Sequence, residues 1–507
     1  MTETLNRLTE YYSVNFFIRQ FLVIVLLYCI GFFVVRAVFC KKNTIEEANT
    51  FYTFLLAFPT GISLFIISGI LLLICHIKYN VLSALITVIT LAALIFVISK
   101  PGKSVLKLER KKIPWLLVVF LLIILALSGV VSVGFSNDSM YYYYAYPHEI
   151  VTNGYLSEKF DIFLTDAGQG TAIINTLPFL FSYNENFGVM NLFNFSFICF
   201  FYFAVYEESI SLNNRNRSHI FALLTTLLLA TTMPFVLISK WAIANVYFME
   251  MMFICVYLNY KFKDRVNDII ILRSILITAL SFIRIEGAVF AGFVMLIYMS
   301  LSNVKKRDVL ISIMPVFVLQ TAYFVRIFLT MDIQATYTFM TKEKAVVAIA
   351  FIVFVLIYSL ICSNDPVIKL PSAIMKLASP ANITFAGLIG VNFLLLLYDR
   401  GLFLSNVRTF AKNMMLNSGW GFFAGLVFVL ILLVPKVRIK DLYFDYIALG
   451  FFLVAFAACF ARGDELRIDL YDSGNRVLLQ IVPFVIYAFA FRNIKAFDIL
   501  HHKEQKS

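Results

Sequence analysis

The sequence predicts an all-α polytopic membrane protein with roughly 13–15 transmembrane helices. Two observations lead to this fold class. Hydrophobic residues occupy 61% of the 507 positions and charged residues only 14%, which is more apolar surface than a soluble domain can bury. Most of these apolar residues fall in runs of roughly 15 to 24 residues, which are long enough to cross a bilayer as helices.

The apolar runs divide around one large polar loop at residues 136–186. Four runs precede it: Phe16–Phe39, Thr53–Cys75, Val81–Ser99 and Ile113–Phe135. Those that follow are Phe187–Val205, Ile220–Ile238, Trp241–Tyr260, Ile269–Ile283, Ala288–Leu301, Val309–Leu329, Ala345–Cys362, Ile383–Tyr398, Trp420–Val434, Tyr446–Phe460 and Val477–Phe491. No repeat or linker separates them. We therefore expect a single integral membrane domain, with N-terminal helices and a basic loop in residues 1–112 and the remaining helices in residues 113–507.

Basic loops predict the orientation, because cytoplasmic loops of membrane proteins are rich in Lys and Arg. The most basic loop, residues 100–112, is expected to be cytoplasmic, which places the 136–186 loop outside. Counting on along the chain, the later basic loops and the C-terminal tail also fall inside. This agreement requires residues 269–301 to form two short helices that meet near Arg284-Ile285-Glu286-Gly287, since one long helix would reverse every later loop.

The remaining composition excludes other classes of protein. The net charge of +12 is explained by basic cytoplasmic loops, and no Lys/Arg cluster with interleaved aromatic residues indicates a nucleic-acid partner. The seven cysteines form no Cys-x-x-Cys pair, so we expect neither a disulfide framework nor a zinc site. The first apolar run is too long for the core of a cleavable signal peptide.

The string Ser136-Asn137-Asp138-Ser139-Met140, followed by four tyrosines, is the strongest functional signal. It places a carboxylate where a membrane helix meets water, and such acids concentrate at functional sites. Asp138 is therefore a candidate general base or metal ligand, although it could instead cap the next helix. Its possible partners in the same loop are His148, Glu149, Asp161 and Asp166. The tyrosines suit anchoring in the headgroup layer.

Arg284 and Glu286 are opposite charges in an otherwise apolar stretch. Such charges must pair, face a cavity or reach water. Arg284 could bind an anionic ligand group through its forked donors while Glu286 orients it. Alternatively, the two residues form a structural ion pair at a helix break, which Gly287 would permit.

Two further outer segments carry charge. Residues 461–475 hold Arg462 and several acids, and Arg476 follows where an apolar helix is expected to start, so that a phosphate could meet both the arginine and the helix N-terminus. The alternative is an ordinary solvated loop. Glu250 lies more than two turns into the helix expected from Trp241, near another outer turn.

Three of these segments resemble motifs of the GT-C superfamily of membrane glycosyltransferases. The Asp138 segment, running through Gly154-Tyr155-Leu156, is similar to the first outer loop of those enzymes, where an acidic motif precedes an aromatic-rich interfacial helix. The Arg284-to-Gly287 segment is similar to their Arg-x-Glu-Gly segment. Asn475-Arg476-Val477-Leu478 through Pro483 resembles the arginine pattern that opens their last helix.

The resemblance implies a GT-C-like fold and a glycosyl transfer. A polyprenyl-phosphate-linked sugar would be the donor, and a cell-envelope glycan or lipid-linked glycan the acceptor, at the extracytoplasmic face of a bacterial plasma membrane. Asp138 would be the base, Arg284 and Arg476 would bind the donor phosphate, and Glu286, His148, Glu149, Asp166, Glu250 and Arg462 would support them. The C-terminus would be cytoplasmic.

The chain departs from the family pattern in three places. Asn137 stands where many members have a second acid, and a lone carboxylate is a poor site for a divalent metal, so we expect no cofactor. Pro147 is expected to kink the interfacial helix. Val477 replaces a tyrosine.

Two other functions remain open from the sequence. A polymerase or ligase of lipid-linked oligosaccharides also works at the outer face, but it usually carries a larger late outer loop than residues 461–475. A transporter or flippase without chemistry would place charges near the middle of the membrane and often shows inverted repeats.

Overall fold

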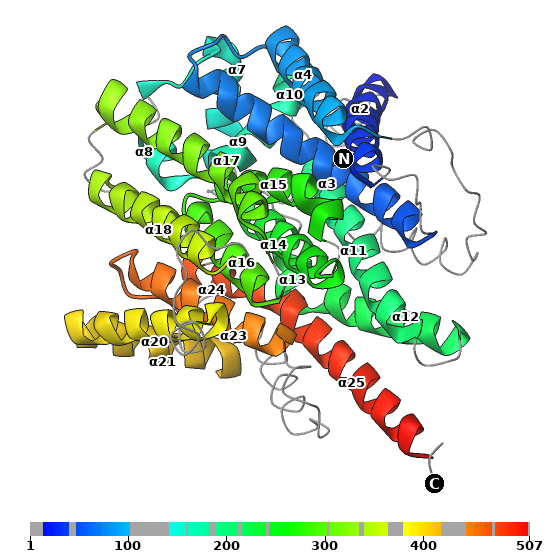
Figure 1. The fold of residues 1–507 in the computed structure, drawn as a ribbon. Helices are drawn as coiled ribbons and strands as arrows, with labels where there is room; N and C mark the ends of the chain where they lie inside the picture. Colours follow the sequence, from blue (N-terminus) through cyan, green and yellow to red (C-terminus); the bar gives the residue numbers. More distant parts are fainter. Residues whose placement is uncertain are drawn as a thin grey trace, which may run out of the picture.

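The structure is a computed structural model, and it describes the following residue ranges: 14–39, 47–101, 141–158, 161–181, 188–210, 215–239, 243–264, 266–301, 304–333, 339–363, 379–416, 443–468 and 472–504. Every regular element within these ranges is a helix (Figure 1), which confirms the all-α class. The predicted spans Ile113–Phe135 and Trp420–Val434, as well as Asp138, lie outside the described residues.

The helices follow most of the predicted runs. Three helices lie at the N-terminal side: α2 (Val14–Phe39), α3 (Glu47–Ile74) and α4 (Val81–Ser99). Short elements follow in η2 (Tyr141–Ala145), α7 (Tyr146–Asn153), α8 (Asp161–Asp166), α9 (Gln169–Asn175) and α10 (Leu177–Leu180). The central helices are α11 (Gly188–Ser209), α12 (Arg215–Thr231), α13 (Met233–Ile238), α14 (Ala244–Lys261), α15 (Val266–Ile283), α16 (Gly287–Leu301), α17 (Lys306–Val325) with η5 (Arg326–Thr330), and α18 (Lys342–Ile361). The last group is α20 (Pro380–Tyr398), α21 (Arg400–Leu416), α23 (Tyr443–Phe460), α24 (Ser473–Val477), η7 (Leu478–Ile481) and α25 (Val482–Glu504).

Among the described residues, eight helical segments are long and apolar enough to cross a membrane, judged by length and composition. They lie in α2, α3, α4, α17 with η5, α18, α20, α23 and η7 with α25. Two shorter apolar helices lie at Ile269–Ile283 and Gly287–Met299. The peripheral helices α4 and α20 expose large apolar side chains such as Leu82, Val97 and Leu394. These surfaces suit lipid and not water, so the chain is a multi-pass membrane protein.

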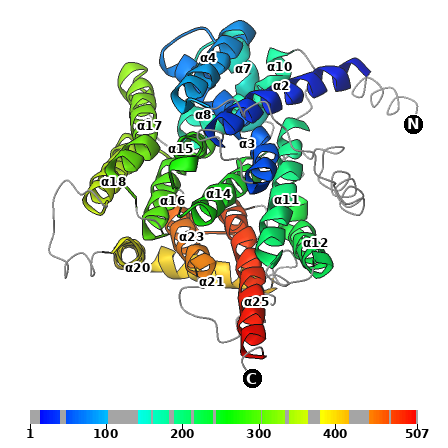
Figure 2. The ribbon, with the colours of Figure 1, turned by 45° about the vertical axis from the view of Figure 1, so that its right-hand side comes forward.

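Helix α14 forms the centre of the bundle (Figures 1 and 2), and all of its residues from Ala244 to Asn259 are buried. The ring of Phe253 illustrates the packing, since it contacts Phe197 of α11 and both Phe484 and Tyr487 of α25. Aromatic rings therefore fill most of the space between these helices.

The chain breaks between α15 and α16 at Arg284-Ile285-Glu286, as the loop charges predict. Gly287 makes this corner possible: a Cβ there would lie 2.6 Å from the carbonyl oxygen of Ser281 and 2.7 Å from that of Leu280. Any larger residue would push the two helices apart.

Hydrogen bonds between distant loops define one end of the bundle. The backbone N–H of Tyr79 donates to the carbonyl oxygen of Gly154 (2.7 Å), and Nζ of Lys344 donates to that of Ala461 (3.1 Å). We call this the site end; its described residues are 75–80, 154–158, 161–168, 284–287, 326–333, 339–344, 461–468 and 472–476. In Figure 1 the C-terminal end of α17, the N-terminal end of α18 and the segment before α24 lie on the left, away from the C-terminus.

Two ion pairs between helices define the opposite end of the bundle. Lys261 at the end of α14 pairs with Glu207 at the end of α11 (3.1 Å), and Arg492 of α25 pairs with Asp445 in the first turn of α23. The helices α14, α15, α16, α17 and α18 run alternately between the two ends, as expected for a chain that crosses a membrane repeatedly.

The helices differ from the sequence-based expectations in two places. The run Ile220–Ile238 is two helices, α12 and α13, because Pro234 cannot continue the helical hydrogen bonds across Thr232. Pro147 lies in the first turn of α7, where the helix changes from the π form of η2 to the α form. Helix α21 was not anticipated, because its charged residues break up its apolar run.

Candidate functional site

The strongest predicted residue, Asp138, lies outside the described residues, which resume at Tyr141. The segment that follows it is anchored at the site end. The ring of Tyr142 packs edge-on against Phe163 (4.8 Å between centroids), and the hydroxyl of Tyr146 donates to Oε1 of Gln169 (2.6 Å). Helix α7 then ends at Gly154, which has a left-handed φ of 78°, as the Gly-Tyr pattern predicts.

Helix α9 carries this segment onto the Arg284 corner. A Cβ on Gly168 would lie 1.7 Å from the carbonyl oxygen of Ile283 and 2.5 Å from Cα of Arg284, so the two backbones touch. The hydroxyl of Thr171 donates to the same Ile283 oxygen (2.8 Å). The absence of a side chain at Gly168 therefore allows the first loop to lie directly against Arg284.

Arg284 and Glu286 form an ion pair, with 2.5 Å between Nε and Oε1. Their side chains are only 18% and 9% exposed. Because the carboxylate holds the Nε edge, the plane of the guanidinium is fixed. The geometry fits the structural ion pair, and it equally fits an arginine that is oriented to receive an anion.

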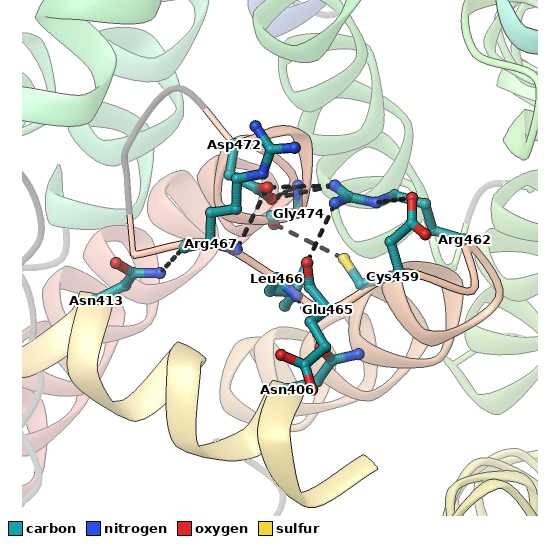
Figure 3. A network of polar contacts seen from close by, with 10 residues as sticks. Asn406, Asn413, Cys459, Arg462, Glu465, Leu466, Arg467, Asp472 and Gly474 are labelled. Atoms are coloured by element: carbon teal, nitrogen blue, oxygen red, sulfur yellow. Dashed lines mark hydrogen bonds and ion pairs between the residues drawn. The ribbon is translucent and has the colours of Figure 1, made fainter. Parts of the chain in front are cut away.

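The loop between α23 and α25 is organised by Asp472 (Figure 3). Its carboxylate accepts two hydrogen bonds from Nη1 of Arg462 (3.2 and 3.3 Å) and further ones from the backbone N–H groups of Gly474 (2.8 Å) and Arg467 (3.4 Å). Asp472 therefore neutralises Arg462 and fixes the loop. The sequence did not single out Asp472, because the loop contains several acids and only the fold selects one of them.

Arg476 lies in the five-residue helix α24, at the start of the last helical stretch of the chain. The helical conformation continues without a break from α24 through the 3-10 turn η7 into α25. The backbone N–H of Arg476 donates to the carbonyl oxygen of Asp472 (3.1 Å), and its side chain is buried. It thus belongs to the same loop as Arg462.

The Arg284 corner and the Asp472 loop both lie near Cys459. The charged groups of Arg284, Glu286, Arg462 and Asp472 all lie within electrostatic range of one atom, Sγ of Cys459 at the end of α23. Segments nearly two hundred residues apart in sequence thus place two arginines and two acids at the same end of the bundle. We call these four residues the charged cluster.

Asp166 is linked to the cluster through the start of α18. Its carboxylate accepts the backbone N–H of Phe339, and Nζ of Lys344 donates to the carbonyl oxygens of Phe339 (2.9 Å) and Ala461 (3.1 Å). Burial raises the pKa of Asp166, while the Phe339 hydrogen bond and the charge of Lys344 oppose that shift. Lys344 was missed from the sequence, since it lies among other lysines at a helix start.

His148 and Glu149 contact other groups. The His148 imidazole is exposed and packs edge-on against Phe179 (5.1 Å), and Glu149 accepts a hydrogen bond from Asn153 one turn further along α7. Within the described residues, neither has a hydrogen bond or ion pair with the charged cluster. The side chain of Asp161 is not described.

Glu250 is fully buried in α14, with an exposed fraction of 0%. Neither of its carboxylate oxygens has a hydrogen-bond partner among the described residues. The neighbouring hydroxyl of Tyr247, one turn earlier, is likewise without a partner there. A buried acid in this state is costly in hydrocarbon and is usually retained for function.

No three His, Cys, Asp or Glu side chains lie close enough to hold a metal ion in the part of the chain that the structure describes. Because Asp138 is outside that part, metal independence stays a prediction. The chain matches none of the family models, curated proteins or solved structures with which it was compared.

Proposed function

We propose that this protein is a glycosyltransferase that moves a sugar from a polyprenyl-phosphate donor to a cell-envelope or lipid-linked glycan, with the site end at the extracytoplasmic face of a bacterial plasma membrane. One observation carries the proposal: the two arginine segments predicted from sequence lie at the same end of α23, each within electrostatic range of Cys459. The chain that leaves Asp138 also packs, through α9, on the Arg284 corner.

In the proposed reaction, Asp138 takes the proton of an acceptor hydroxyl while that oxygen attacks the anomeric carbon of the donor sugar. The bond between this carbon and the phosphate oxygen breaks, and the polyprenyl phosphate leaves with the electron pair. Arg284 stabilises the negative charge that grows on the leaving phosphate, and Glu286 holds the guanidinium in the required plane.

The three arginines receive different roles. Arg284 is the first choice for the phosphate, because its orientation is fixed by a single carboxylate. Arg462 shapes the loop, because its partner Asp472 also accepts hydrogen bonds from the loop backbone at Arg467 and Gly474. Arg476 follows in the same loop and is the second phosphate candidate.

The proposal is tested with purified full-length protein in detergent or vesicles, given a polyprenyl-phosphate sugar and extracted envelope glycan. The expected product is the acceptor heavier by one sugar, with release of polyprenyl phosphate, measured by mass spectrometry. In cells, loss of the gene should remove a sugar branch from the envelope glycan. Shortened glycan chains would instead indicate a polymerase or ligase.

A transporter or flippase of lipid-linked sugars is the second candidate, and Glu250 favours it. A buried acid without a described partner in the middle of the central helix is typical of transport pathways. Movement of a fluorescent lipid-linked sugar across vesicle membranes, without any product bond, would support this alternative. A Glu250→Gln variant that stops the movement would assign it to this residue.

A further inference from the structure

A groove of about 850 Å³ lies between α15 and α17, with the C-terminal end of α4 forming its third wall. Its walls are aliphatic, for example Ile98 of α4, Ile275 of α15 and Val318 of α17, and the polar side chains that line it are Ser274 and Arg307. Ile98 and Val318 are 55% and 51% exposed, so the groove opens sideways from the bundle.

The backbone carbonyl group that Pro315 leaves without a helical partner in the groove wall is already hydrogen-bonded within the protein. Pro315 lies inside α17 and lacks an N–H, so the carbonyl oxygen of Ile311 loses its helical partner. The hydroxyl of Ser274 on α15 replaces that partner by donating to Ile311 (2.7 Å). The groove therefore offers hydrocarbon along its length.

Arg307 is the one charged residue among those that line the groove, and it lies at the opposite end of the bundle from the charged cluster. Arg307 is exposed in the first turn of α17 and has no ion pair with any described residue. Lining residues run along α17 from Arg307 to Leu319, a length of ~18 Å at the helical rise. That length is close to half of a hydrocarbon core of ~30 Å, so the groove spans about one leaflet.

We propose that this groove binds one anionic phospholipid from the leaflet at the opposite end, with an acyl chain along the aliphatic walls and the phosphate on Arg307. A chain of one-leaflet length with a negative head matches both the depth and the charge of the groove. The site is separate from the charged cluster and does not depend on the proposed glycosyl transfer.

The test uses delipidated full-length protein and native mass spectrometry with two lipids that share acyl chains, phosphatidylglycerol and phosphatidylcholine. The wild type should bind the first phosphatidylglycerol more tightly. Arg307→Gln should lower that affinity by about fivefold and remove the preference. Lys306→Gln removes a neighbouring charge that does not line the groove, and it should retain the preference.

A second variant tests the chain site. Ile98→Trp should fill the groove and weaken both lipids alike, and because Ile98 is largely exposed the protein should still fold. Equal affinity of the wild type for both lipids, or equal losses in Arg307→Gln and Lys306→Gln, would overturn the proposal. So would displacement of the lipid by inorganic phosphate, because that would show an anion site without a chain.

Discussion

At the residue scale, the ion pair between Arg284 and Glu286 has two possible roles, one structural and one in binding the donor phosphate. The structure places them 2.5 Å apart and mostly buried at the break between two helices. Removing one partner of such a pair leaves an uncompensated charge, so a simple deletion cannot separate a structural role from a catalytic one. A substitution that keeps the positive charge but changes the donor geometry can distinguish the two roles.

Arg284→Lys keeps the positive charge but loses the forked donor geometry. If Arg284 binds the donor phosphate, kcat/KM for sugar transfer should fall by about 10- to 100-fold with a weaker apparent donor affinity, as expected for one lost charge-assisted hydrogen bond. The reversed pair, Arg284→Glu with Glu286→Arg, is the control. Restored activity in that double variant counts against the phosphate role, because it keeps the ion pair alone.

Asp138 carries the proposed mechanism. Asp138→Asn keeps the size and most of the hydrogen bonding, so the protein should fold while transfer drops by ~10²–10⁴. The matched variant Asp166→Asn should cost much less, because Asp166 is bound to the backbone of Phe339. Near wild-type turnover in Asp138→Asn would falsify the assignment and move the search for the base to Glu149, Asp161 and Asp166.

At the scale of elements, close backbone contacts position the cluster. Gly287 allows the corner between α15 and α16, and Gly168 allows α9 to lie against that corner. The Asp472 loop then adds its arginines from the far end of the sequence. Glycines at the close contacts between elements therefore determine where the charged side chains lie.

Gly287→Ala tests this role. The added Cβ would lie 2.6 Å from a carbonyl oxygen, so the variant should lose about 1–3 kcal/mol of stability. Gly387→Ala in α20 is the control: a Cβ there meets nothing within 4 Å, and alanine should be neutral or stabilising by up to ~1 kcal/mol. Thermal unfolding in detergent measures both. Equal behaviour of the two variants would refute the packing argument.

At the scale of the whole molecule, the contacts sort the described loops into two ends. Residues 75–80, 154–158, 161–168, 284–287, 461–468 and 472–476 lie at the site end, and the ion pairs of Lys261 and Arg492 lie at the other. The positive-inside rule predicts that the site end faces outward.

Single cysteines at Ser104 and Ser157 test this orientation in a background without native cysteines. Ser157 follows α7 at the site end and should react with an impermeant maleimide in intact cells, whereas Ser104, in the most basic loop, should not. Labelling at both positions to the same extent, or at Ser104 alone, would remove the extracytoplasmic site and the proposed donor with it.

The sequence by itself determined the class of the protein. Its apolar runs predicted the helices, and its loop charges predicted the break at Arg284–Gly287, because a bilayer constrains length and charge along the chain. The tertiary structure alone decided which charges meet. Arg462 lies closer to Asp472 (3.2 Å) than to Asp464 (4.0 Å), Arg476 lies in the short helix directly before η7, and Glu250 is buried in the core. These outcomes depend on packing between distant helices, which no local pattern records.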